Sequence, residues 1–236
     1  MNLILLCEED FIENTGTVRI EGRRLRHVLE VHRASPGDEL CVGMLGGERG
    51  KGRITELTGE YLEMDVRLGL APPPALPVTL ILALPRPKVL KRTLITASSM
   101  GVKRIILINS YRVEKSFWQS PVLKDDSVEK QLLLGLEQAR DTIMPDVVAR
   151  PLFKPFVEDE LPDIIKETLP LLAHPHASAL CPRGLEGRAT LAIGPEGGFI
   201  PYEIEKFSAC GFLPVRMGER ILSVESAVPA LLSRLF

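Results

Sequence analysis

The chain lacks the features of a membrane or secreted protein. No apolar run approaches the ~18 residues that a membrane helix needs, and the opening MNLILLCEED turns acidic after a few apolar residues, without the basic flank of a signal peptide. Its four cysteines, Cys7, Cys41, Cys181 and Cys210, form no C-x-x-C pair, so neither a zinc site nor a disulfide framework is indicated. The composition, 45% hydrophobic and 25% charged residues, is that of a globular protein. Together with the missing membrane, signal and zinc patterns, it leads us to expect a cytoplasmic protein without a metal or a membrane partner.

The net charge of −2 conceals an uneven distribution. Between Arg86 and Lys115 there are eight basic residues and one acidic residue, whereas acidic residues outnumber basic ones 13 to 9 in residues 1–70 and 17 to 12 from Ser116 onward. A basic segment in a slightly acidic protein suits a polyanionic partner. A solvated helix face is the alternative explanation.

A proline-rich joint, LGLAPPPALPVTL over Leu68–Leu80, divides two patterns. Before it, short apolar or alternating segments (residues 1–7, 39–45, 51–59 and 61–68) are separated by turn residues and predict a small β-barrel. One helix interrupts them in GRRLRHVLEVHR, residues 22–33. Its periodicity predicts that Leu25, Val28, Leu29 and His32 share one face.

After the joint, apolar segments alternate with helical patterns. The segment 88–101 predicts a helix with Leu90, Leu94 and Ala97 inward and Lys88, Lys91 and Arg92 outward. Such alternation predicts an α/β domain with a mostly parallel sheet and helices on both faces.

The stretch LAIGPEGGFIPYEIEKF, residues 191–207, reads as a strand, a glycine-rich turn and a helix. Ligands of parallel sheets bind at the carboxyl ends of strands. A phosphate loop would carry a lysine and a Ser or Thr after its glycines, and this one carries neither. It holds Glu196 instead, which suits a ligand that is neutral or cationic near the glycines; a purely structural turn is the alternative.

A second strand-to-helix junction follows in VRMGERILSVESAVPALL, residues 215–232. Arg220 and Glu225 flank the turn and could face one pocket, although a surface ion pair is the plainer explanation. Ser226 is a candidate cap for the last helix, which would place Pro229 in its first turn.

Taken together, IGPEGG and the following MGERILSVESA resemble the signature of the ribosomal RNA small-subunit methyltransferase E family, in the SPOUT class. Three other segments resemble that family in the same order: RRLRHVLEVHRASPGDEL, RPKVLKRTLITASSMGVKRI and GLEQAR. The resemblance therefore spans nearly the whole chain.

The resemblance implies a PUA-like RNA-binding β-barrel over residues 1–70, a linker over 71–77 and a SPOUT α/β methyltransferase domain with a trefoil knot over 78–236. It implies a homodimer that uses S-adenosylmethionine (SAM) to methylate N3 of a uridine in 16S ribosomal RNA, free or in the small ribosomal subunit. Three loops would hold the donor, with these expected contact residues: Leu172, Ala173, His174, Gly194, Pro195, Glu196, Gly197, Gly198, Met217, Gly218, Ile221 and Leu222.

Methylation of N3 requires removal of its proton and alignment of the nitrogen with the methyl group. Glu225 is the candidate proton acceptor, and Arg220 the candidate for stabilising charge on the uracil oxygens. The expected RNA-binding residues are Arg23, Arg24, Arg26, Arg86, Lys88, Lys91 and Arg92.

The chain departs from the family pattern mainly where RNA would be contacted. No arginine lies in MNLILL, Ala139-Arg140-Asp141 replaces a Cys-Gly-Arg element, and Ser223 replaces an arginine two residues before Glu225. A methyltransferase of another RNA site, or a non-catalytic RNA-binding or ribosome-assembly protein of the same fold, are therefore alternatives.

Overall fold

The computed structural model of the chain describes residues 2–13 and 15–236, so Met1, the first residue of the predicted strand 1–7, lies outside it. The chain forms two compact units. The first runs to Pro74 and also contains Leu133–Met144, and the second comprises Ala75–Leu132 and Pro145–Phe236. No helix of the described chain is both long enough and apolar enough to cross a bilayer.

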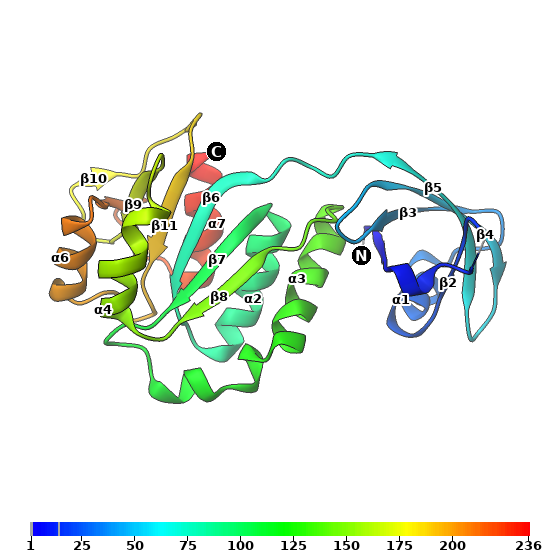
Figure 1. Cartoon of the computed structure of the whole chain (residues 1–236), viewed down its shortest axis with the longest axis horizontal. Helices are drawn as coiled ribbons and strands as arrows, with labels where there is room; N and C mark the ends of the chain where they lie inside the picture. Colours follow the sequence, from blue (N-terminus) through cyan, green and yellow to red (C-terminus); the bar gives the residue numbers. More distant parts are fainter. Residues whose placement is uncertain (1, 14) are drawn as a thin grey trace. The chain divides into compact units, whose positions relative to one another are not determined.

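The first unit is built on a curled five-stranded sheet with the order β1-β3-β4-β5-β2 (Figure 1). Its strands are β1 (Ile4–Leu6), β2 (Thr17–Ile20), β3 (Glu39–Met44), β4 (Arg49–Leu57) and β5 (Leu62–Leu70). Only β1 and β3 pair in parallel among the neighbours in this sheet. The alternation of β4 and β5 buries Ile54, Leu62 and Met64 in its core, as expected for strands with one solvated face.

The helix expected over residues 22–33 is shorter and less regular than its sequence pattern. Helix α1 (Gly22–His27) continues as a π-helical turn over Val28–His32. Leu25 and Val28 are buried as predicted, but Leu29 is 37% exposed and His32 is exposed, so that part of the prediction was wrong. The wider π-turn rotates every later residue away from the face that a regular α-helix would present.

The last turns of helix α3 (Asp125–Ala139) and the segment after it belong to the first unit. There Leu136 is fully buried with Leu3 and Leu5 in a second apolar cluster. The Glu137 carboxylate accepts two hydrogen bonds from Arg23, at 2.9 and 2.6 Å.

The second unit contains a seven-stranded, wholly parallel sheet with the order β10-β12-β9-β11-β6-β7-β8 (Figure 1). The strands are β6 (Leu76–Ala83), β7 (Val102–Ile108), β8 (Asp146–Arg150), β9 (Leu169–Ala173), β10 (Ala179–Leu180), β11 (Ala189–Ile193) and β12 (Leu213–Arg216). Every residue of β11 is buried, as in a central parallel strand covered on both faces.

Helices cover both faces of this sheet (Figure 1). They are α2 (Pro87–Ser99), the first half of α3, α4 (Phe153–Pro155), α5 (Leu161–Ile164), α6 (Pro201–Ala209) and α7 (Val224–Leu235), with a π-helical turn at Phe156–Glu160 and short 3-10 turns at Lys115–Gln119 and Pro121–Leu123. Helix α7 packs against α2 and β11. In α2 the predicted faces are confirmed, since Leu90, Leu94 and Ala97 are buried and Lys88, Lys91 and Arg92 are exposed.

Candidate functional site

A cavity of about 320 Å³ lies at one edge of the parallel sheet, where three neighbouring strands end. Strands β12, β9 and β11 are adjacent and parallel, so their carboxyl ends meet at the same edge. The segments that follow these strands line the cavity, and eleven of the twelve residues expected to contact a donor are among them: Ala173, His174, Gly194, Pro195, Glu196, Gly197, Gly198, Met217, Gly218, Ile221 and Leu222.

The twelfth, Leu172, is fully buried within β9 and is not part of the cavity lining. It pairs with Ala192 on one side and Pro214 on the other. Its neighbour Ala173, the last residue of the strand, is the one that reaches the cavity.

Two glycines allow the backbone conformation of the loop after β11. A Cβ atom on Gly194 would lie 3.1 Å from the backbone nitrogen of Phe199 and 3.2 Å from Cα of Gly198, so a side chain would push against the backbone of the same loop. Gly198 has φ of +72°, in the left-handed region that favours glycine. The loop therefore closes tightly on itself beside the cavity.

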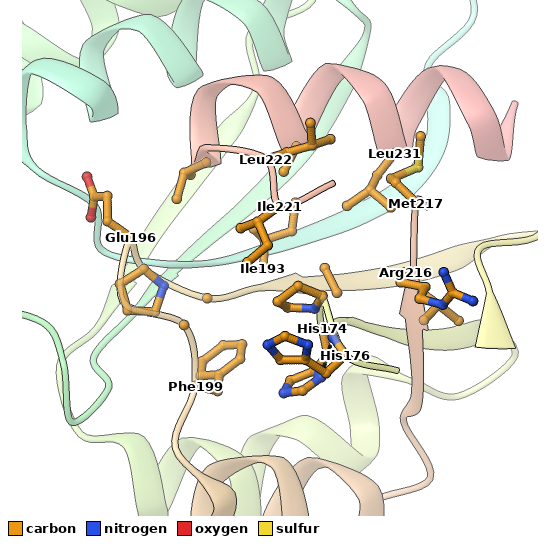
Figure 2. A pocket seen from close by; sticks show the side chains of 18 of the residues that line it. His174, His176, Ile193, Glu196, Phe199, Arg216, Met217, Ile221, Leu222 and Leu231 are labelled. Atoms are coloured by element: carbon orange, nitrogen blue, oxygen red, sulfur yellow. Dashed lines mark hydrogen bonds between the residues drawn. The ribbon is translucent and has the colours of Figure 1, made fainter. Parts of the chain in front are cut away.

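The Glu196 carboxylate is used to hold the loop in place. Its Oε1 accepts a hydrogen bond of 3.1 Å from the backbone N–H of Arg86, the residue that precedes α2. Figure 2 shows this carboxylate directed away from the centre of the cavity, where Ile193, Ile221 and His174 lie. The expectation that Glu196 faces a cationic ligand is therefore less well supported than a structural role for this carboxylate at the start of α2.

Arg112 reaches the cavity from the loop after β7 and was not among the residues expected at the site. Its guanidinium donates a hydrogen bond to the carbonyl oxygen of Gly197. A Cβ atom on Gly197 would come within 2.9 Å of Arg112 Cδ, so the glycine leaves room for this side chain. No local motif signals this contact, because 84 residues separate the two partners in the sequence.

Apolar side chains and two imidazoles fill much of the remaining wall. Ile193, Phe199 and Leu231 join Ile221 and Leu222 around the cavity (Figure 2). Burial lowers the pKa of His174, and the neighbouring His176 lowers it further, which favours the neutral ring near pH 7. The cavity thus offers an apolar interior with loop backbone at its edges, as expected for a small-molecule site.

Arg220 lines the cavity, whereas Glu225 lies in the first turn of α7 and is not among the lining residues. Glu225 Oε2 accepts a hydrogen bond of 3.2 Å from Arg92 on α2. Both side chains are more than a third exposed, so this ion pair contributes little to stability. The expectation that Arg220 and Glu225 could face one pocket holds only for Arg220.

The last helix begins earlier than the sequence indicated. Its N-terminal cap is Ser223, not Ser226, and the two hydroxyl oxygens are 3.1 Å apart. Pro229 therefore lies in the second turn, where its missing N–H leaves the carbonyl oxygen of Glu225 without a partner within the helix.

The residues expected to bind RNA fall into two groups. Arg86, Lys88, Lys91 and Arg92 are exposed at the start of α2, and Arg26 is exposed on α1. Arg23 and Arg24 are engaged by carboxylates of their own unit, since Arg24 donates to both oxygens of Asp10, at 2.6 and 2.7 Å, and to the carbonyl of Leu5. For these two residues a structural role accounts for the charge.

Within residues 2–13 and 15–236, no group of three or more His, Cys, Asp and Glu side chains is arranged to hold a metal ion.

A family model described as the RNA methyltransferase domain matches residues 72–236. This chain belongs to the RNA methyltransferase domain family. The matched residues include all three cavity-lining segments.

Full-length relatives agree with this assignment and confirm the resemblance to the ribosomal RNA small-subunit methyltransferase E family. The chain is 29% identical over 235 residues to ribosomal RNA small subunit methyltransferase E of Treponema pallidum, covering 98% of this chain and 88% of that protein. It is 27% identical to the protein of the same name from Synechocystis, over 98% of this chain and 76% of the relative.

Among solved structures, ribosomal RNA small subunit methyltransferase E from Neisseria gonorrhoeae, bound to S-adenosyl methionine, superposes with a TM-score of 0.77. The match covers 99% of this chain and 95% of that one at 21% identity. A likeness at this identity establishes that this chain and the Neisseria gonorrhoeae protein share the mixed α/β fold.

Proposed function

We propose that this chain transfers a methyl group from SAM to ribosomal RNA, and that the acceptor is N3 of a uridine in 16S ribosomal RNA. The observation that carries the proposal is the cavity formed where β9, β11 and β12 end, in a chain of the RNA methyltransferase family. The Neisseria gonorrhoeae relative of the same fold binds this donor. The uridine acceptor is drawn from the family resemblance alone.

The residues of the cavity fit the donor. SAM carries no phosphate, and the glycine loop offers no lysine that would hold one. The apolar side chains of Ile193, Ile221 and Leu231 suit an adenine ring, and the backbone of the tight loop suits its polar edge. When bound, SAM would supply the electrophilic methyl group, so neither a metal nor a covalent enzyme intermediate is required.

The chain's own residues would then align the acceptor and remove its proton. Glu225 is the proposed acceptor of the N3 proton, either directly or through a water molecule. Arg92, 3.2 Å from its carboxylate, orients Glu225 toward α2. Arg220, on the cavity wall, is placed to stabilise the negative charge that develops on the uracil oxygens.

The finer features of the proposal are the PUA-like barrel, the trefoil knot, the homodimer and the cytoplasmic location. The curled sheet of the first unit supports the barrel. The return of α7 from β12, the strand next to the edge strand β10, to pack against α2 and β11 supports the knot. The dimer and the cytoplasmic location follow from the family resemblance.

Two measurements test the activity. Isothermal titration with SAM is expected to show binding at one site per chain, and a chain that fails to bind SAM is no SAM-dependent methyltransferase. Mass mapping of nucleosides in 16S ribosomal RNA, from cells with and without this protein, is expected to show loss of one 3-methyluridine. Loss of a different methylated nucleoside would replace the acceptor, and no change alongside retained RNA binding would favour a non-catalytic ribosome-assembly role.

A further inference from the structure

A tight turn after β7 presents Tyr111 and Arg112 at its tip. The N–H of Val113 donates to the carbonyl oxygen of Ser110 at 3.0 Å, which closes the turn around these two residues. Ser110 and Val113 are both buried, so the turn is fixed at its two ends.

Two further contacts fix the tip beside the cavity. The backbone N–H of Tyr111 donates to Oε1 of Glu203 at 2.7 Å, and the Glu203 side chain is almost completely buried at the start of α6. The side chain of Arg112 donates to Gly197, which lines the cavity together with Arg112 itself. The position of Tyr111 relative to the glycine loop is therefore set by hydrogen bonds on both sides.

Tyr111 is 80% exposed, the largest exposed fraction among the exposed large hydrophobic residues of the described chain. No ring–ring or cation–π contact of the described residues involves it. An aromatic ring held on a rigid backbone and left in solvent gains free energy only when something covers it.

We propose that Tyr111 is a stacking platform for a nucleobase of the RNA substrate, next to the cavity that takes the methyl donor. Base–aromatic stacking is a common means of holding an unpaired base in RNA recognition. The charge near Tyr111 favours RNA as the occupant, because the exposed Arg112 follows it in the turn and the exposed Arg86, whose backbone N–H donates to Glu196 of the glycine loop, lies at the same edge of the sheet. This inference rests on the proposed function and adds to it a contact residue for the acceptor strand.

The test compares Tyr111→Phe, which keeps the ring, with Tyr111→Leu, which keeps apolar bulk without it. Unmodified 16S ribosomal RNA, free and in small subunits from cells lacking this protein, is the probe. Tyr111→Leu is expected to lower kcat/KM for RNA by about 10- to 100-fold, as loss of one stacked base implies. Tyr111→Phe is expected to stay within about twofold of the unaltered protein, with SAM affinity unchanged in both variants.

Salt dependence separates stacking from phosphate contact. Tyr111→Leu is expected to weaken RNA binding by the same factor at every salt concentration, leaving the log–log slope unchanged. Arg86→Ala is expected to reduce that slope by about 0.9 or less. Leu213→Ala serves as a control, since this exposed side chain lies at the amino-terminal end of β12, away from the cavity-lining segments, and its loss should leave RNA use intact.

The inference is overturned if Tyr111→Leu uses RNA as well as the unaltered protein does, or if the variant loses SAM affinity to the same extent. A change in oligomeric state with unchanged RNA affinity would assign Tyr111 to a contact between two copies of the chain, which also overturns it. If the unaltered protein methylates no RNA, the proposed function fails instead, and RNA dissociation constants of the same variants still decide whether Tyr111 contacts a base.

Discussion

Gly194 is a cavity-lining residue at which one added carbon would crowd the loop after β11. A Cβ atom there would lie 3.1 Å from the backbone nitrogen of Phe199, 3.2 Å from Cα of Gly198 and 3.2 Å from Cδ2 of the Phe199 ring. We expect Gly194→Ala to weaken SAM binding about tenfold or more, since the loop must distort to accept it. Isothermal titration measures this directly.

Gly187→Ala is the matched control, because a Cβ atom on Gly187 would meet nothing within 4 Å. It should leave SAM affinity unchanged. Equal affinity in Gly194→Ala and the unaltered protein would mean that this loop does not bound the donor site.

The proposed proton acceptor gives a second prediction at the scale of single residues. Glu225→Gln keeps the size of the side chain but removes its basicity, so turnover should fall by roughly 100-fold or more while SAM affinity is retained. Single-turnover methylation of 16S ribosomal RNA measures the effect. Glu219→Gln, on the exposed loop before α7, is the control, and unchanged turnover in Glu225→Gln would remove Glu225 from the mechanism.

Arg24 and Arg26 are two residues apart on α1 and should behave differently. Arg24 has both its carboxylate partner Asp10 and the Leu5 carbonyl, so Arg24→Ala should lower the free energy of unfolding by about 2 kcal/mol. Arg26 is exposed, and Arg26→Ala should leave stability within about 0.5 kcal/mol. Urea denaturation distinguishes the two, and equal stability losses would contradict this division of roles.

At the scale of elements, the start of α6 depends on one buried carboxylate. Glu203 accepts hydrogen bonds from the backbone N–H groups of Ile200, at 2.9 Å, and Tyr111, at 2.7 Å. Glu203→Ala leaves both donors without this partner and should cost about 2 kcal/mol of stability or more. It should also impair RNA use, because the turn that carries Tyr111 loses an anchor.

Glu205→Ala is the control for this prediction, since Glu205 is exposed on the same helix and its loss should change stability by less than about 0.5 kcal/mol. Glu203→Gln keeps one acceptor oxygen, so its loss of stability should lie between those of Glu205→Ala and Glu203→Ala. A Glu203→Ala protein as stable as the control would show that the carboxylate does not hold the helix start.

Elements with a clear period could be predicted from the sequence, and irregular ones could not. The 3.6-residue pattern of Leu90, Leu94 and Ala97 was sufficient for α2. The same 3.6-residue pattern wrongly placed Leu29 on the buried face, because the sequence pattern does not reveal the π-helical turn at Val28–His32. The short strands β2 and β10 were missed for a similar reason, since two to four residues carry too little periodicity.

The candidate site divides in the same way. The residues of the loops after β9, β11 and β12 were named from the family resemblance, and eleven of those twelve residues line the cavity. Arg112 and Glu203 could not be named in advance, because each acts on a residue more than 80 positions away in the sequence. Arg23 and Arg24 likewise counted as free basic residues until their carboxylate partners were visible.

At the scale of the whole molecule, the first unit is discontinuous in sequence. The proline-rich joint marks the place where the chain leaves it, but nothing in the unbroken helix α3 marks Leu133 as the point of return. Leu136 then completes a cluster with Leu3 and Leu5. The predicted division into an RNA-binding domain of residues 1–70, a linker of residues 71–77 and a methyltransferase domain of residues 78–236 stays a prediction.

A fragment of residues 1–74 should therefore be poorly folded. It lacks the buried Leu136 side chain and the Glu137 carboxylate that engages Arg23. Loss of one buried leucine alone costs about 2–5 kcal/mol. We expect a broad urea transition for the fragment that sharpens when a peptide of residues 125–144 is added, and a cooperative transition without the peptide would contradict this.

The return of Leu133–Met144 also bears on how the protein is made. A ribosome that has finished Pro74 must add 70 more residues before Met144 leaves its active site, which takes about 4–14 s at about 5–20 residues per second. During that interval Leu3 and Leu5 lack the later cluster residues Leu133, Leu136 and Met144, and the nascent chain exposes apolar surface that a chaperone can hold. Slowing elongation between these two points should lengthen that exposure and raise the share of chains that aggregate.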